Sequence, residues 1–159
     1  MGNLVLLSHC LLNQGVRAKG FPLEMKIQKE ILEILSRYCL PILQLPCPEF
    51  SFLGEREKMT YDQYEKLVGF REHCKRLAEQ VEEYIKKSGK HSLLVIGIAG
   101  SPSCSLSRIT VRGEKRKGEG IFIQELKKKI KGEYVELDYD NPEFSLRKVK
   151  ERLKKLSDR

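Results

Sequence analysis

The sequence predicts an α/β fold, and three observations support this. Short apolar runs of strand length alternate along the chain with segments in which apolar residues recur at helical spacing. The run at 93–99 is apolar on both faces, which is typical of a central parallel strand covered by helices on each side. Strand and helix alternate from beginning to end, which favours a mostly parallel sheet. We therefore expect a single domain over residues 1–159, folded as a Rossmann-like three-layer sandwich with about four strands.

The predicted elements follow from these patterns. Strands are expected where apolar runs are short and bounded by Gly, Pro or polar residues, at 3–9, 40–45, 93–99 and 134–139. Helices are expected where apolar residues recur at three and four, at 23–38, from Thr60 or Asp62 to Ser88, at 121–130 and from Asn141 onward. Two segments lack a clear period, so we expect 50–59 to be irregular and 105–119 to be a mobile basic loop.

The composition favours a globular protein of the cytoplasm. Hydrophobic residues make up 40% of the chain and charged residues 33%, which differs from disordered chains. No apolar run approaches the roughly 20 residues of a membrane helix, and the short run at 4–7 lacks the basic leader of a signal peptide. The formal net charge of +8 would attract phosphates or nucleic acid. A solvated lysine-rich surface explains the same charge.

Three of the five cysteines directly follow predicted strands. Cys10, Cys47 and Cys104 each end an apolar run and are flanked by small, polar or proline residues. Right-handed crossovers place the carboxyl ends of parallel strands at one edge of a sheet, so we expect these three thiols to converge there. Cys39 and Cys74 lie on or near predicted helices and are expected to be structural. An odd cysteine count without a secretion signal argues against a disulfide framework.

Three converging thiolates suit a soft metal or an iron–sulfur cluster. A structural zinc site usually has four ligands and short paired spacings such as C-x₂-C, which this sequence lacks, although His9 is a candidate fourth ligand. A cubane held by three cysteines would leave one iron open to a substrate sulfur or oxygen. The alternative of thiol catalysis by Cys10 with Arg17 is weaker, because their spacing is one residue longer than in the phosphate loop of small tyrosine phosphatases.

Two oxygen-bearing side chains accompany the cysteines. Glu49 follows Cys47 by two positions, and a carboxyl beside an apolar, metal-bearing pocket can act as a general acid. Ser101 precedes Cys104 by three positions in a turn fixed by a proline, and it could orient a substrate or a water. Simpler interpretations are a surface glutamate and an ordinary turn serine, so spacing alone leaves both roles open.

Three short motifs, taken together and in order, resemble the signatures of the thiouracil desulfidase family. They are Ser8-His9-Cys10-Leu11-Leu12-Asn13, Leu45-Pro46-Cys47-Pro48-Glu49 and Gly100-Ser101-Pro102-Ser103-Cys104. The resemblance implies a 4Fe–4S cluster on Cys10, Cys47 and Cys104, with one iron that lacks a protein ligand. It also implies that Glu49 and Ser101 are catalytic.

In the implied reaction, the thiocarbonyl sulfur of a thiolated pyrimidine binds the open iron and water attacks the ring carbon. Glu49 relays protons, Ser101 positions the ring or the water, and sulfide leaves without net redox change. We further expect Asn13 and Ser103 to bind substrate, and the basic loop to hold a substrate phosphate through Arg112, with Arg108 and Arg116 as the alternatives. The chain departs from the best-studied members at Asn13 and at 50–56, which places it on a desulfidase-related side branch.

The expected substrate is therefore a small thiolated base, nucleoside or nucleotide. Two alternatives stay open. An RNA-binding module with a structural metal site would explain the basic carboxy-terminal helix, but aromatic residues that stack on bases are almost absent from the basic runs. A sulfur-transfer or sulfur-carrier protein would use the same sulfur chemistry and hand sulfur to an acceptor protein.

Overall fold

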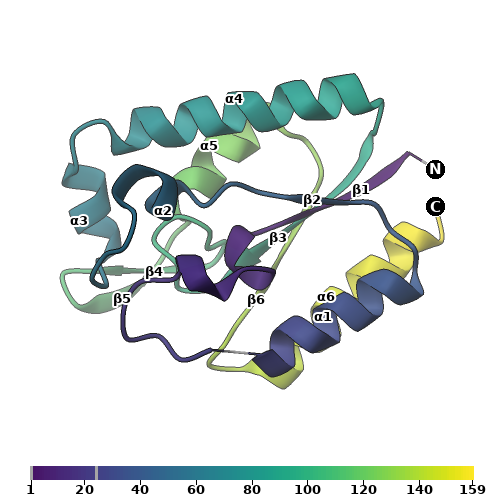
Figure 1. The fold of residues 1–159 in the computed structure, drawn as a ribbon, viewed down its shortest axis with the longest axis horizontal. Coiled ribbons are helices and arrows are strands. Elements are labelled where there is room, and N and C mark those ends of the chain that lie inside the picture. The colour runs from purple at the N-terminus through teal and green to yellow at the C-terminus, as the bar shows by residue number, and fades with distance from the viewer. Residues whose placement is uncertain (1, 24) are drawn as a thin grey trace.

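The computed structural model describes residues 2–23 and 25–159, and its centre is a parallel sheet (Figure 1). The strands lie in the order β2-β1-β3-β6. Their bounds are Asn3–Leu7 for β1, Ile42–Gln44 for β2, Ser92–Ile98 for β3 and Glu133–Leu137 for β6. All of β1 is buried, as expected of a central strand in which four of five residues are apolar. The four predicted strands are confirmed, with β2 shorter than the apolar run suggested.

Helices cover both faces of this sheet. The helices α4 (Phe70–Ser88) and α5 (Ile121–Lys129) pack on one face, and α1 (Met25–Arg37) and α6 (Pro142–Ser157) pack on the other (Figure 1). Successive side chains of a strand point to opposite faces, so β1 and β3 contribute alternate residues to both apolar layers. The three-layer α/β sandwich predicted from the sequence is confirmed. Glu24, within the predicted first helix, lies outside the described residues.

The helix predicted from Thr60 or Asp62 to Ser88 is wrong in one respect, because it is two helices. The first, α3, spans Tyr61–Lys66, and α4 begins only at Phe70. Gly69 separates them with a φ of +86°, a left-handed conformation that glycine adopts without the steric cost of a side chain. The break brings the Tyr64 and Phe70 rings to 4.7 Å between centroids, so apolar packing stabilises the bend.

The segment expected to be irregular begins with a short helix, α2 (Pro48–Leu53). Proline suits the first turn of a helix because its missing N–H would have no partner there. The sulfur of Cys47 takes the capping position and accepts a hydrogen bond from the Phe50 N–H at 3.4 Å. Cysteine is an unusual cap, and therefore the sequence pattern gave no signal for this helix.

The segment expected to be a mobile basic loop is instead a β-hairpin. Strands β4 (Arg108–Val111) and β5 (Glu114–Lys117) pair antiparallel. Arg112 and Gly113 connect them with φ values of 50° and 80°, the two positive angles of a tight hairpin turn. All four side chains of β5 are exposed, so no apolar alternation marks this strand in the sequence.

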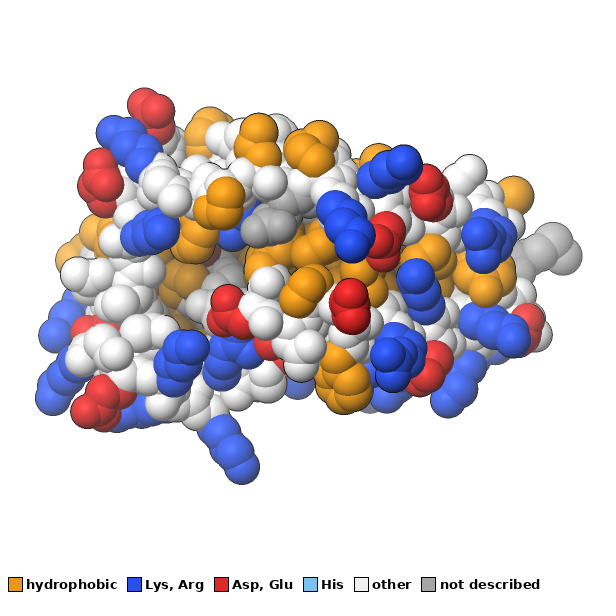
Figure 2. All heavy atoms as spheres, turned by 90° about the horizontal axis from the view of Figure 1, so that it is seen from below, with side chains coloured by type: hydrophobic (Ala, Val, Ile, Leu, Met, Phe, Trp, Pro, Cys, Tyr) orange, Lys and Arg blue, Asp and Glu red, His pale blue; other side chains and the backbone are white. Residues whose placement is uncertain are grey.

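The charged surface is mixed in sign. Figure 2, a view from below relative to Figure 1, shows Lys and Arg side chains interspersed with Asp and Glu over the visible face. Several basic side chains form ion pairs with neighbouring acids on their own helix, as Lys86 does with Glu82 at 2.9 Å and Lys87 with Glu83 at 2.8 Å. Within the described residues, no helix has both the length and the apolar character needed to cross a membrane.

Candidate active site

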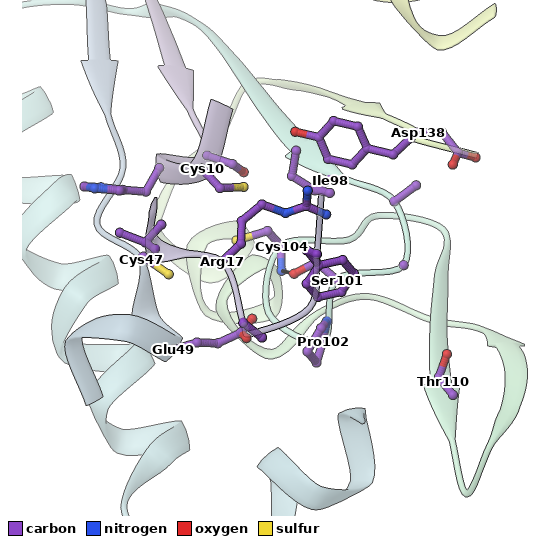
Figure 3. A pocket seen from close by; sticks show the side chains of 18 of the residues that line it. Cys10, Arg17, Cys47, Glu49, Ile98, Ser101, Pro102, Cys104, Thr110 and Asp138 are labelled. Atoms are coloured by element: carbon purple, nitrogen blue, oxygen red, sulfur yellow. Dashed lines mark hydrogen bonds between the residues drawn. The ribbon is translucent and has the colours of Figure 1, made fainter. Parts of the chain in front are cut away.

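A cavity of about 280 Å³ opens at the carboxyl edge of the parallel sheet. Its wall takes residues from the segments that follow β1, β2, β3 and β6, which is where open α/β sheets place their ligands. Cys10, Cys47 and Cys104 all line it. Figure 3 shows their three sulfur atoms directed toward a common space. The structure thus brings together the three cysteines that the sequence singled out.

Cys10 is fixed by hydrogen bonds that join the ends of two strands. It lies in a short 3₁₀ turn, η1 (His9–Leu11), directly after β1. The His9 ring nitrogen Nδ1 lies 2.9 Å from the carbonyl oxygen of Leu45, and the side chain of Gln44 donates to the His9 carbonyl at 3.0 Å. His9 therefore bridges β1 and β2 through its ring, and it also lines the cavity.

Cys47 is held at the amino-terminal end of α2. Besides the cap formed by its sulfur, its carbonyl accepts from the Ser51 hydroxyl at 2.7 Å. Ser51 Oγ also lies 2.7 Å from Nε2 of His73 on α4. These contacts fasten α2 to the long helix, so the Cys47 sulfur has a fixed direction toward the cavity.

Cys104 lies in a tight loop after β3. Its carbonyl accepts from the Ile98 N–H at 2.9 Å, and the Ser101 hydroxyl accepts from the N–H of Cys104 at 3.0 Å. A Cβ on Gly97 would lie 2.3 Å from the Cys104 carbonyl oxygen, and a Cβ on Gly120 would lie 2.2 Å from the Ser103 carbonyl carbon. Glycine at both positions allows the cysteine loop to approach β3 and α5 this closely.

The same loop completes the first turn of α5. The N–H groups of Ile121 and Ile123 donate to the carbonyls of Pro102 and Ser103 at 3.0 and 3.1 Å. The first N–H groups of a helix have no acceptor within the helix, and here the backbone carbonyls of the Cys104 loop are the acceptors. The loop and the helix therefore position each other.

The three thiols are buried and lie near other groups that can carry a negative charge. Burial raises the pKa of Cys10 to about 12, with a further increase from the neighbouring Cys47. Burial likewise raises the pKa of Cys47 and of Cys104, and the other two thiols raise that of Cys104 further. Neutral thiols are therefore favoured in this cavity near neutral pH, and thiolates there require a positive partner such as a metal.

The donor set fits an iron–sulfur cluster in its chemistry. Cys10, Cys47 and Cys104 line one cavity, and thiolate sulfur is the ligand that such clusters prefer. In the described part of the chain, no group of three His, Cys, Asp or Glu side chains has the arrangement of a site for a single metal ion.

Glu49 lines the cavity beside the cysteines and forms a buried ion pair. Its Oε1 lies 3.0 Å from the Arg56 guanidinium, and its Oε2 accepts from the Ser103 hydroxyl at 2.8 Å. The Arg56 guanidinium also donates to the Tyr64 hydroxyl and to the Val16 carbonyl. Sequence reasoning missed Arg56, because it lies in a segment without helical or strand period. Its distance of seven positions from Glu49 carries no recognisable signal.

Arg17 occupies another part of the cavity wall. Its guanidinium carbon lies 4.3 Å from the centre of the Phe21 ring and 4.8 Å from that of the Tyr139 ring. One of its nitrogens donates to the carbonyl of Pro22 at 2.9 Å. Its positive charge lowers the pKa of Cys10 and so opposes the effect of burial. Arg17 thus presents a fixed cation to the thiols.

The predicted catalytic and substrate-binding residues divide into two groups. Ser101 and Glu49 line the cavity, whereas Asn13, Ser103 and Arg112, all within the described residues, do not belong to its wall. Asn13 is exposed and caps a 3₁₀ turn through the Gly15 N–H, and Arg112 forms the turn of the hairpin. Ser103 is buried and donates to Glu49.

The hairpin contributes other residues to the cavity. Arg108, Thr110 and Lys115 line the wall. Arg108 donates two hydrogen bonds to the Asp138 carboxylate, at 2.6 and 2.8 Å, and one to Asp140 at 3.0 Å. These ion pairs attach the hairpin to the segment after β6 and place it at the mouth of the cavity.

Comparisons with known proteins agree with this geometry. The family model described as "Putative 2-thiouracil desulfurase" matches residues 3–126. An uncharacterised protein of Methanocaldococcus jannaschii is 32% identical over 130 residues, which are 80% of this chain and 77% of that protein. The solved structure of the 4Fe–4S-dependent thiouracil desulfidase TudS superposes with a TM-score of 0.52, at 22% identity, over 91% of this chain and 96% of that one.

The match to the family model covers more than half of the chain and includes all three cysteine loops, Glu49 and Ser101. The likeness to TudS shows that the fold is shared. The resemblance first visible in three short motifs therefore extends over the sheet that carries them. This chain belongs to the 2-thiouracil desulfurase family.

Proposed function

We propose that this protein is an iron–sulfur-dependent desulfidase that hydrolyses the carbon–sulfur bond of a thiolated pyrimidine base, nucleoside or nucleotide. Membership of a desulfurase family supports the reaction class. The observation that carries the proposal is the convergence of three cysteines on one cavity that also has a buried carboxylate, Glu49, in its wall. The overall change is C=S plus water to C=O plus hydrogen sulfide, which balances without an oxidant or a reductant.

In this proposal Cys10, Cys47 and Cys104 hold a 4Fe–4S cluster, and one of its irons has no protein ligand. When bound, the cluster supplies a Lewis acid that polarises the carbon–sulfur bond. Arg17 supports this arrangement because its positive charge offsets part of the negative charge that three thiolates bring into the cavity.

Glu49 acts on protons in this scheme. Its carboxylate lines the cavity and is held in place by the ion pair with Arg56. It takes a proton from the water that attacks the ring carbon, and it then returns this proton to the departing sulfur. Ser103 orients the carboxylate by donating to Oε2. We therefore assign Ser103 a positioning role in place of substrate contact.

Ser101 is suited to donate a hydrogen bond into the cavity. Its oxygen accepts from the N–H groups of Ser103 and Cys104, and these two bonds fix the oxygen beside the thiols. The hydroxyl proton is then available to the ring or to the attacking water, since a hydroxyl donates one bond while it accepts two. Ser101 is therefore a substrate- or water-orienting group.

Phe21 and Tyr139 line the cavity, with the Arg17 guanidinium packed over both rings, and in this proposal they contact the substrate ring. A nucleotide phosphate would face the hairpin. Arg108 is already paired with two aspartates, whereas Lys115 forms no ion pair with any described residue. We assign the phosphate contact to Lys115 in place of Arg112, which lies in the hairpin turn outside the wall.

The test is the iron and acid-labile sulfide content per chain after anaerobic purification. Wild type is compared with Cys10→Ala, Cys47→Ala and Cys104→Ala, and the exposed Cys39→Ala is the matched control. We expect near-equal iron and sulfide in wild type and in the control, and loss of both in the other three variants. Loaded protein should then release sulfide from a thiouracil or a thiouridine monophosphate. Zinc, or no metal after reconstitution, would overturn the proposal.

A further inference from the structure

The side-chain hydroxyl of Ser8 has no ordinary hydrogen-bond partner among the described residues. Ser8 follows β1 directly and is 1% exposed. Its N–H donates to the Ile96 carbonyl at 3.0 Å, but its hydroxyl oxygen forms no ordinary hydrogen bond with any residue that the structure describes. A buried hydroxyl without a partner has lost its hydrogen bonds to water without replacing them, which is unfavourable. Such a group therefore points to a ligand or a functional contact.

The position of Ser8 identifies that contact. Ser8 lines the same cavity as Cys10 and Cys104. Its hydroxyl interacts with the Cys104 thiol and lowers the pKa of that group, against the effect of burial and of the neighbouring thiols. In the structure this contact lies outside ordinary hydrogen-bond geometry, and a neutral thiol is in any case a weak acceptor. A thiolate is charged and accepts a much stronger bond.

We propose that Ser8 is a positioning residue of the metal site, whose hydroxyl donates a hydrogen bond to the Cys104 sulfur once that sulfur ligates the cluster. The inference rests on the proposed function. A hydrogen bond to a ligating sulfur withdraws electron density from it, which raises the reduction potential of the cluster. The same effect makes the irons better Lewis acids.

The chain contains a matched control for this residue. Ser105 is fully buried, and its hydroxyl oxygen also lacks a partner among the described residues. It follows Cys104 directly, yet it is absent from the described cavity wall. Replacing either serine by alanine removes one buried oxygen near the same cysteine. Only the Ser8 change removes a donor that lines the cavity.

The experiment measures iron and sulfide content first, and then the midpoint potential of the cluster by a redox titration followed by electron paramagnetic resonance. Wild type, Ser8→Ala and Ser105→Ala are compared after anaerobic purification. We expect equal cluster content in all three and a more negative potential in Ser8→Ala, with Ser105→Ala unchanged from wild type. Loss of iron from Ser8→Ala alone, with normal thermal unfolding, would support the same contact.

Other outcomes overturn the inference. An unchanged potential in Ser8→Ala, or an equal shift in both variants, would show that the hydroxyl does not act on the cluster. A change in KM for a thiouracil without a shift in potential would assign Ser8 to the substrate instead. A wild-type protein without a cluster would overturn the proposed function itself, and the metal analysis of wild type separates that result from the others.

Discussion

The Arg56 guanidinium lies 3.0 Å from the Glu49 carboxylate, and both side chains are almost fully buried, at 7% and 12% exposure. A buried ion pair is strongly destabilising when one partner is removed, because the other charge is left without compensation. This pair therefore links the stability of the fold to the charge state of the proposed catalytic carboxylate.

Replacing Arg56 by Met should lower the free energy of unfolding by about 3–5 kcal/mol, measured by urea denaturation of the protein without cofactor. The control is Lys19→Met, which removes an ion pair with Glu57 whose side chains are 52% and 80% exposed. That change should cost less than about 1 kcal/mol. Equal losses of unfolding free energy in the two variants would show that the buried Arg56 pair stabilises the fold no more than an exposed pair does.

Replacing Glu49 by Gln should lower kcat by about 10²–10⁴-fold, because the amide cannot accept the proton of the attacking water. Ser103→Ala should have a smaller effect on kcat, since it removes only the hydrogen bond that orients the carboxylate. Iron content is measured in both variants, so that a lost cluster is not mistaken for lost proton transfer. A Glu49→Gln enzyme with wild-type kcat would remove Glu49 from the proton steps.

Replacing Gly97 by Ala should release the cluster, because the added Cβ would lie 2.3 Å from the Cys104 carbonyl and force the loop away from β3. Gly15→Ala is the milder control, since its Cβ would meet only the Asn13 side chain at 3.1 Å. The measurements are iron per chain and the unfolding midpoint temperature. Full iron loading in Gly97→Ala would contradict the tight packing of this loop.

The pair of Arg108 and Asp138 predicts a dependence of stability on pH. Hydrogen bonding to Arg108 holds the pKa of Asp138 below its usual value. A carboxyl whose pKa is lowered on folding adds stability above its unfolded pKa and loses that contribution as the pH falls through its folded pKa. Asp138→Asn should therefore destabilise the protein at pH 7, and the difference from wild type should shrink steadily in acid.

The measurement is the free energy of unfolding of wild type and Asp138→Asn between pH 7 and pH 3. Asp140 contacts the same arginine but is 74% exposed, so Asp140→Asn is the control and should change stability little at any pH. A destabilisation by Asp138→Asn that stays constant across this range would mean that the charge of Asp138 contributes nothing.

Lys115→Ala should raise KM for a thiouridine monophosphate by about tenfold and leave KM for the free thiolated base unchanged. The expected size follows from the loss of one charge-assisted hydrogen bond, worth about 1.5–3 kcal/mol. Arg112→Ala is the control, because Arg112 lies in the hairpin turn outside the described cavity wall. Equal changes for base and nucleotide would show that Lys115 does not bind a phosphate.

Much of the architecture followed from local sequence patterns. The apolar run that forms β3 and the positions of Cys10, Cys47 and Cys104 after their strands were enough to predict the sheet and the convergence of the thiols. These inferences succeed because the carboxyl ends of parallel strands meet at one edge whatever the intervening loops do. Spacing to the cysteines also singled out Glu49 and Ser101, which both line the cavity, and the family motifs then implied a catalytic role for them.

The rest depended on tertiary contacts that no period in the sequence reveals. Arg56 pairs with Glu49 only because α2 and the following segment fold back together, and β5 is exposed along its whole length. Gly69 lies within a continuous apolar pattern, so the sequence gives no sign of the left-handed conformation that it adopts in the folded protein. The placement of Ser103 against Glu49 likewise depends on two loops that are distant in sequence.

The hydrogen bonds between the Cys104 loop and the first turn of α5 have a consequence for maturation of the protein. They satisfy the backbone of both segments through groups that belong to the chain alone. This part of the fold is thus held together by contacts within the chain, unlike small zinc domains that stay unfolded until they are loaded. If the chain binds the proposed cluster, the loop that carries Cys104 is already positioned against α5 to receive it.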